Sequence, residues 1–267
     1  MLLFNRGITD CNNELREFRS QDSTPIATSS QRVSGNVETP SDSPLFFYRS
    51  GEFMIEIKRI ADGEVVLRVD AANLAGHRFV NTDLSGTDLS GLDFSGADLR
   101  NCNLNDCDCR DANFAKATLT NSVMNRAHIQ HANFDGADVT DTCFSKALMS
   151  GVSARRANFR YAKMNECDLS QADLTDADCS FSEMRAVMHG TKLVRTNLYG
   201  VDLTDADLSE SDLRESNMTN AKTEGAVFNG ANMEGSTGVY GQKFGTTGPF
   251  KRKEKRRPWW QLWAKTG

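Results

Sequence analysis

A five-residue period runs through the middle of the chain and constrains its fold more than any other feature. Residues 72–235 divide into 32 full five-residue units, interrupted by one four-residue unit at 182–185, where we expect a tight corner. The first residue of a unit is small (Ala, Ser, Thr, Cys or Val) in 30 units, and the third is Leu, Phe, Met, Ile or Val in 28. The second is Asp or Asn in 20. A pattern sustained for this length indicates a solenoid built from stacked units.

A period of five matches neither the 3.6-residue turn of a helix nor the two-residue alternation of a strand. It does fit short extended segments joined by a corner every five residues. The small first residue and the large third residue then point inward, whereas the second, fourth and fifth face water.

The repeated A(D/N)LXX pattern resembles the pentapeptide-repeat family over residues 72–235. That resemblance implies an all-β fold, a right-handed quadrilateral β-helix with four units in each coil. If the resemblance holds, residues 20 apart stack at about 4.8 Å. One interior stack is then predicted to contain Leu74, Phe94, Phe114, Phe134, Ala154 and Leu174. It is very specific for the fold and says almost nothing about function.

The segments on either side of the repeats differ from the repeats in composition. Residues 53–70 alternate in polarity around Asp62-Gly63, a strong hairpin signal, and we expect a β-hairpin there that caps the solenoid. Residues 1–52, rich in Ser, Thr, Gln and Pro over 20–44, are expected to be largely disordered. Residues 236–267 are expected to form a flexible, basic, Trp-rich tail, and Met54 suggests an alternative translation start.

Hydropathy and cysteine content bear on the compartment. No run of 18 apolar residues is present, and the first residues turn polar after four positions, so we expect neither a transmembrane helix nor a signal peptide. An odd number of cysteines, 7, fits a reducing environment. The expected location is the cytoplasm. If the C-terminal tail binds a membrane, the protein is expected to lie peripherally at the inner membrane face.

The polar residues form no distinctive catalytic pattern. Cys102, Cys107 and Cys109 fall in inward positions, which favours buried core thiols over a metal site. Cys143 falls in an outward second position and is expected to be exposed and reactive. The many Asp residues recur because turns favour them. We therefore expect no catalytic residue, no metal and no cofactor.

A basic band interrupts the acidic repeats. Residues 142–165 carry five cations and no acid, and Arg126 should stack beneath Lys146. Unit 152–156 also lacks a large third residue, and weak packing beside concentrated charge is typical of a binding surface. The plainer interpretation is a solvated face with an imperfect repeat. The candidate residues are Arg126, Lys146, Arg155, Arg156, Arg160 and Lys163.

The tail is the second candidate site. Its cations and tryptophans suit an anionic membrane surface or a protein groove, and less well a nucleic acid; a solubilising tail is the plainest interpretation. The residues are Lys251, Arg252, Lys253, Lys255, Arg256, Arg257, Trp259, Trp260 and Trp263.

The sequence favours a non-enzymatic scaffold or protein-interaction module with an unknown protein partner, placed at a membrane surface if the tail acts as a tether. Some relatives of the quinolone-resistance type look like DNA and occupy a groove of DNA gyrase, and the net charge of −9 over residues 71–235 permits that alternative. Interspersed Asn residues and the basic tail count against it. A secreted bacterial effector is a second alternative, suggested only by the Ser/Thr-rich start.

Overall fold

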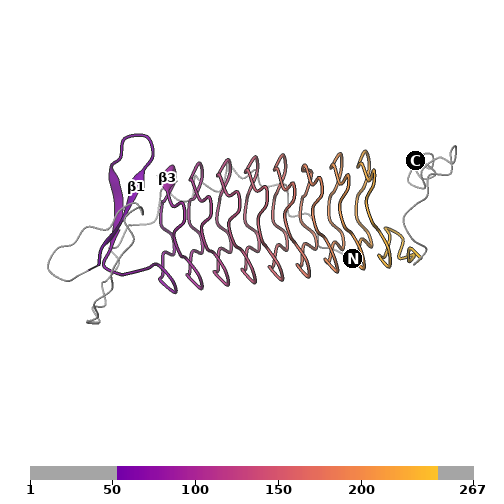
Figure 1. Ribbon diagram of the computed structural model, residues 1–267, viewed down its shortest axis with the longest axis horizontal. Coiled ribbons are helices and arrows are strands. Elements are labelled where there is room, and N and C mark those ends of the chain that lie inside the picture. The colour runs from indigo at the N-terminus through magenta and orange to yellow at the C-terminus, as the bar shows by residue number, and fades with distance from the viewer. Residues whose placement is uncertain (1–52, 246–267) are drawn as a thin grey trace, which may run out of the picture. The chain divides into compact units, whose positions relative to one another are not determined.

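The computed structural model describes residues 53–245, in which a β-hairpin precedes a β-solenoid (Figure 1). The hairpin consists of β1 (Ile55–Arg59) and β2 (Val65–Val69), and β3 (Thr87–Asp88) belongs to the first coil. Gly63 turns the chain between β1 and β2 with a φ of 71°, a conformation that glycine adopts without strain. The predicted hairpin is confirmed.

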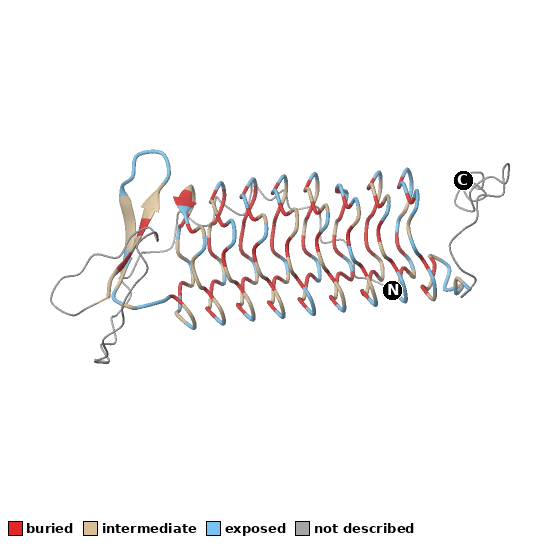
Figure 2. Cartoon of the chain, in the orientation of Figure 1, coloured by how far each residue is buried: buried red, intermediate tan, exposed pale blue. Residues whose placement is uncertain are grey.

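The solenoid has the predicted four units per coil. Isolated parallel bridges connect the second residues of units one coil apart, such as Asp83 with Asn103 and Asn103 with Val123. The first and third residues of most units are buried, and the corners are exposed (Figure 2). The protein is therefore an all-β, right-handed quadrilateral β-helix, as expected.

The interior consists of side chains stacked along the solenoid. The ring centroids of Phe94 and Phe114 are 5.2 Å apart, and those of Phe114 and Phe134 are 4.9 Å apart. All three side chains are fully buried. Such aromatic pairs add about 0.5–1.5 kcal/mol each to the stabilisation from apolar burial.

Most positions of a unit donate the backbone N–H to a partner that recurs from unit to unit. The N–H of a third residue donates to the next coil, as Leu84 does to the Asn103 carbonyl at 2.8 Å. The N–H of a fourth residue often donates to the side chain two residues earlier, as Ser85 does to Asp83 Oδ1 at 3.0 Å. Recurrent Asp and Asn therefore serve the turns, as predicted.

The fifth residue of all 32 full units has a positive φ, and in 21 of these units it is not glycine. This left-handed conformation costs about 1 kcal/mol for most side chains. In many units it directs the N–H to the next coil, as Lys116 shows by donating to the Asp135 carbonyl at 2.9 Å. Corner side chains are consequently held in a defined direction although they face water.

The four-residue unit lacks this fifth residue. Bridged partners that span it, such as Asp168 with Val187, are 19 residues apart, and the spacing returns to 20 at Val187 with Asp207. Only Arg185 separates Met184 from the next unit, and the chain bends at Ala186, so this corner is one residue shorter than the others, as the predicted tight corner requires.

One prediction about a side chain is wrong. Cys143 is 1% exposed, although its second position was expected to face water. It lies in a column between Val123 and Lys163 of the neighbouring coils, and Val123 is also buried. A side chain this deeply buried is not the exposed, reactive thiol that was predicted.

Both described ends of the solenoid carry antiparallel pairing. β1 pairs with β3 of the first coil in the register of Lys58 with Asp88, and pairing of this kind satisfies an otherwise open sheet edge. Residues 236–245, assigned from sequence to the tail, form an antiparallel bridge between Thr237 and Lys243. Among the described residues, no helix is long and apolar enough to cross a membrane.

Candidate functional site

The solenoid distributes the six candidate cations over three corners and one face. Arg155 and Arg156 follow the first face of their coil and lie together, whereas Arg126 and Lys146 follow the third face. In a four-sided coil these two corners are diagonally opposite. The six residues therefore do not form one continuous surface.

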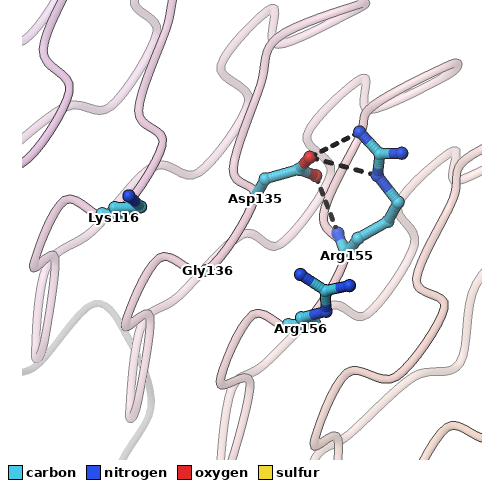
Figure 3. Close-up of a pocket in the computed structure, with 5 residues that line it drawn as sticks. All are labelled: Lys116, Asp135, Gly136, Arg155 and Arg156. Atoms are coloured by element: carbon cyan, nitrogen blue, oxygen red, sulfur yellow. Dashed lines mark hydrogen bonds and ion pairs between the residues drawn. The ribbon is translucent and has the colours of Figure 1, made fainter.

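The corner at Arg155 and Arg156 contains a hollow of about 360 Å³ (Figure 3). Lys116, Asp135 and Gly136 line it with the two arginines. The fifth residues of three successive coils are Lys116, Gly136 and Arg156. Gly136 has no side chain, so a space is left between the two cations. The glycine creates the gap, and Lys116 and Arg156 form its walls.

Several later glycines at this position are covered by the fifth side chain of the preceding coil, as Gly151 is by His131 and Gly200 by Phe181. Four glycines of the first two coils have nothing within 4 Å of the position of a Cβ: Gly76, Gly86, Gly91 and Gly96. At Gly136 only the stem of Lys116 comes close, with its Cγ 3.7 Å from the position a Cβ would occupy. The ammonium group of Lys116 therefore does not cover the glycine.

Asp135 does not cancel the charge of the hollow, because its carboxylate is already engaged. It accepts hydrogen bonds from the Arg155 guanidinium at 2.6 Å (Nη2) and 3.1 Å (Nε), and from the Arg155 backbone N–H at 2.9 Å (Figure 3). Ser153 donates a further hydrogen bond at 2.6 Å. Burial opposes ionisation, but the hydrogen bonds from Arg155 and Ser153 hold the pKa of Asp135 below its usual value.

Lys116 and Arg156 keep their charges available. Within residues 53–245, neither makes a salt bridge. The acid that Arg156 influences most clearly, Asp176, already accepts two hydrogen bonds from Arg195 at 2.6 and 2.8 Å. The hollow therefore presents two exposed, uncompensated cations to a ligand.

The opposite corner shows the contrast. Arg126 makes a bidentate salt bridge to Asp106, with distances of 2.6 and 2.7 Å, and Lys146 lies 3.6 Å from Glu166. The predicted stacking of Arg126 beneath Lys146 is confirmed by their shared column, but both have acidic partners. Arg160 lies over the ring of Tyr161 at a third corner, and Lys163 lies on the third face.

The three cysteines that were assigned to inward positions belong to the interior, as predicted. Cys102, Cys107 and Cys109 are at most 1% exposed, and the thiols of Cys102 and Cys107 donate to the carbonyls of Phe79 and Leu84 at 3.0 and 2.8 Å. Burial raises the pKa of Cys102 to about 12. No group of three potential metal ligands occurs within the described part of the chain.

Sequence reasoning missed Lys116, Asp135 and Gly136, because the basic band was defined by neighbours along the chain. A signal was present: Lys116 and Arg156 are both fifth residues and lie two coils apart, with Gly136 between them. The candidate tail residues lie outside the described residues, so their role stays a prediction.

Comparison with known proteins identifies the repeats. The family model for pentapeptide repeats matches in 8 copies, over residues 70–106, 107–145, 155–187, 184–220 and 206–237. These segments cover more than half of the chain. A comparison with curated proteins found no match.

Several solved structures are similar to this chain. HetL, a pentapeptide repeat protein involved in heterocyst differentiation regulation in the cyanobacterium Nostoc sp., is 22% identical, with 64% of this chain and 91% of HetL covered and a TM-score of 0.30. Trypsin-treated QnrB1, a plasmid-mediated fluoroquinolone resistance protein, is 21% identical, with 59% and 86% covered and a TM-score of 0.44. A pentapeptide repeat protein from the Arabidopsis thaliana thylakoid lumen is 30% identical, with 48% and 68% covered and a TM-score of 0.19. The similarity concerns the repeats and carries no argument about partners.

Proposed function

The chain belongs to the pentapeptide-repeat family, and we propose that it is a non-enzymatic protein-interaction module. Its binding site is the hollow at Gly136, and its ligand is an acidic side chain or short acidic segment of a partner protein. The observation that carries this proposal is the pair of uncompensated cations, Lys116 and Arg156, on either side of a gap in an otherwise acidic solenoid.

The surrounding charge favours a protein ligand over a nucleic acid. Residues 71–235 have a net charge of −9, which repels a long polyanion. A single carboxylate that projects from a protein surface can enter the hollow while the rest of the partner stays away from the acidic columns. Arg155 lines the hollow, and its salt bridge to Asp135 holds its guanidinium in place.

The gyrase-binding alternative has less support. A DNA mimic needs a continuous surface of unpaired negative charge, and salt bridges to nine of the 24 acids of residues 71–235 interrupt that surface. The paired residues include Asp98, Asp106, Asp108, Asp135, Asp173, Asp176, Asp202 and Asp212. The secreted-effector alternative rests on residues that the structure does not describe.

The test is binding of a fluorescent hexaglutamate peptide to the full chain, measured by anisotropy at low and high salt. We expect salt-sensitive binding that is at least about tenfold weaker in the Lys116→Glu/Arg156→Glu variant, which corresponds to about 1.4 kcal/mol. Glu and Lys are both unbranched at Cβ, so the exchange does not add strain at the left-handed positions.

The matched control is the Arg126→Glu/Lys146→Glu variant, which makes the same change in net charge at the opposite corner. An equal loss in both variants would show a general charge effect and contradict the proposal. Tighter binding of a DNA duplex than of hexaglutamate would do the same. Inhibition of gyrase supercoiling by the chain would instead support the DNA-mimic alternative.

A further inference from the structure

An exposed cluster of three aromatic rings lies at the corner that follows the second face. Tyr161 and Phe181 are fifth residues of successive coils, each 45% exposed, with ring centroids 5.5 Å apart and planes 11° from parallel. Tyr199 continues the cluster with its ring 5.4 Å from that of Phe181 at 76°. We call Tyr161, Phe181 and Tyr199 the aromatic corner.

The faces of these rings are largely occupied within the protein. The Arg160 guanidinium lies 5.6 Å from the centre of the Tyr161 ring, and Phe181 lies against Gly200, with ring atoms 3.0 Å from the position of a Cβ. The rings of Tyr161 and Phe181 also stack on each other. Their edges are therefore left for a ligand, and aromatic edges pack well against the face of another ring.

Strong negative charge lies in the last coils, between the aromatic corner and the C-terminal end of the solenoid, although none of these acids belongs to the corner that follows the second face. Residues 201–235 carry eight acids and two cations, which is most of the net charge of the solenoid. Six of the eight acids make no salt bridge within residues 53–245: Asp205, Asp207, Glu210, Glu215, Glu224 and Glu234. The last coils therefore suit a cationic partner with aromatic side chains.

The chain itself supplies a segment of this composition. Residues 251–257 carry six cations and one acid, and Trp259, Trp260 and Trp263 follow. This segment begins six residues after Gly245, where the described solenoid ends. Bridges from Asn197 to Asn217 and from Asn217 to Thr237 place Tyr199 about two coils, or about 10 Å, from that end. Fourteen extended residues reach about 46 Å, so Trp259 can reach the aromatic corner.

We propose that residues 251–263 bind back onto their own solenoid. The basic run pairs with the acids of residues 201–235, and the tryptophans pack on the edges of Tyr161 and Phe181. The tether gives this segment an effective concentration in the millimolar range, an advantage over the same segment of a second copy or of another protein. The interaction masks the tail whenever the protein is not bound elsewhere.

The three tryptophans of the protein all lie in this tail, so tryptophan emission reports on the tail alone. The experiment compares acrylamide quenching of the full chain with quenching of a peptide of residues 246–267, at low salt. We expect quenching of the full chain to be about twofold weaker, because the rings are packed. Protection should decrease as salt screens the charges.

The variant that tests the site is Tyr161→Asn/Phe181→Asn, because Asn tolerates the left-handed conformation of both positions. We expect its quenching to match that of the peptide. The control, Leu148→Thr/Val187→Thr, removes two exposed apolar side chains from another face and should keep the protection.

Three results would overturn the proposal. Equal quenching of the full chain and the peptide would show that the tail is not bound. Unchanged protection in the Tyr161→Asn/Phe181→Asn variant would place the tail elsewhere. Protection that rises with protein concentration would show that the tail binds a second copy.

Discussion

Phe114 and Lys116 belong to the same five-residue unit but obey different constraints. Phe114 is fully buried between Phe94 and Phe134, so its size is set by its neighbours in the stack. Lys116 has a fixed backbone conformation but an exposed side chain, and the fold accepts many residue types at its position. The interior therefore specifies the fold, and the corners are where one solenoid can differ from another in what it binds.

The largest effect should come from the interior. Phe114→Ala is expected to lower the free energy of unfolding by about 3–5 kcal/mol, because it removes an aromatic ring from a closely packed stack. Lys116→Asn should change it by less than about 0.5 kcal/mol, since Asn tolerates the left-handed conformation. Denaturant unfolding of both variants measures the difference, and similar losses would contradict the contrast between interior and corner.

A second prediction concerns the acid stability of the protein and the side chain of Asp202. Burial opposes its ionisation, but hydrogen bonds from Arg185 and Thr204 lower the pKa of Asp202 to about 2. Because the folded pKa is below the unfolded value of about 3.9, this stabilisation is present above pH 4 and is lost as the pH falls toward 2. The wild-type protein should lose up to about 2 kcal/mol more than Asp202→Asn over that range. Parallel acid titrations of stability would refute the assignment.

A smaller loss is expected from the turn hydrogen bonds. Asn133 Oδ1 accepts the Asp135 backbone N–H at 2.9 Å, beside the hollow. Asn133→Ala should destabilise the protein by about 1 kcal/mol, whereas Asn133→Asp keeps this acceptor, loses only the hydrogen bond that Asn133 Nδ2 donates to Asn113 Oδ1 at 3.2 Å, and should cost less. Thermal unfolding of the two variants separates the hydrogen bond from the loss of side-chain volume.

A small effect on stability should accompany a large effect on binding at Gly136. Gly136→Asn places a side chain in the hollow, where its Cβ meets only Lys116 Cγ at 3.7 Å. We expect stability to change by less than about 1 kcal/mol and hexaglutamate binding to weaken about tenfold. Unchanged binding in a stable Gly136→Asn variant would exclude the hollow as the site.

The sequence predicted the interior better than the corners for a physical reason. The small first residue and large third residue repeat because both are buried in every coil, so Phe94, Phe114 and Phe134 could be placed in one stack. Cys143 could not, because burial of a second residue depends on the side chains that flank it in neighbouring coils.

Predicting the candidate site likewise requires knowing which side chains lie next to each other in neighbouring coils. Arg155 and Arg156 were recognised from local charge, but Arg126 and Lys146 resemble them in sequence and differ only in having Asp106 and Glu166 as partners. The gap at Gly136 depends on how far Lys116 extends over it, which no local pattern reports.

The most direct test is a map of amide chemical-shift changes when isotope-labelled full-length protein is titrated with hexaglutamate. The hollow predicts changes confined to the corner of Lys116, Gly136 and Arg156, with the corner of Arg126 and Lys146 unaffected. Changes of equal size at both corners, or changes only elsewhere on the solenoid, would contradict the claim that uncompensated charge at one corner defines the binding site.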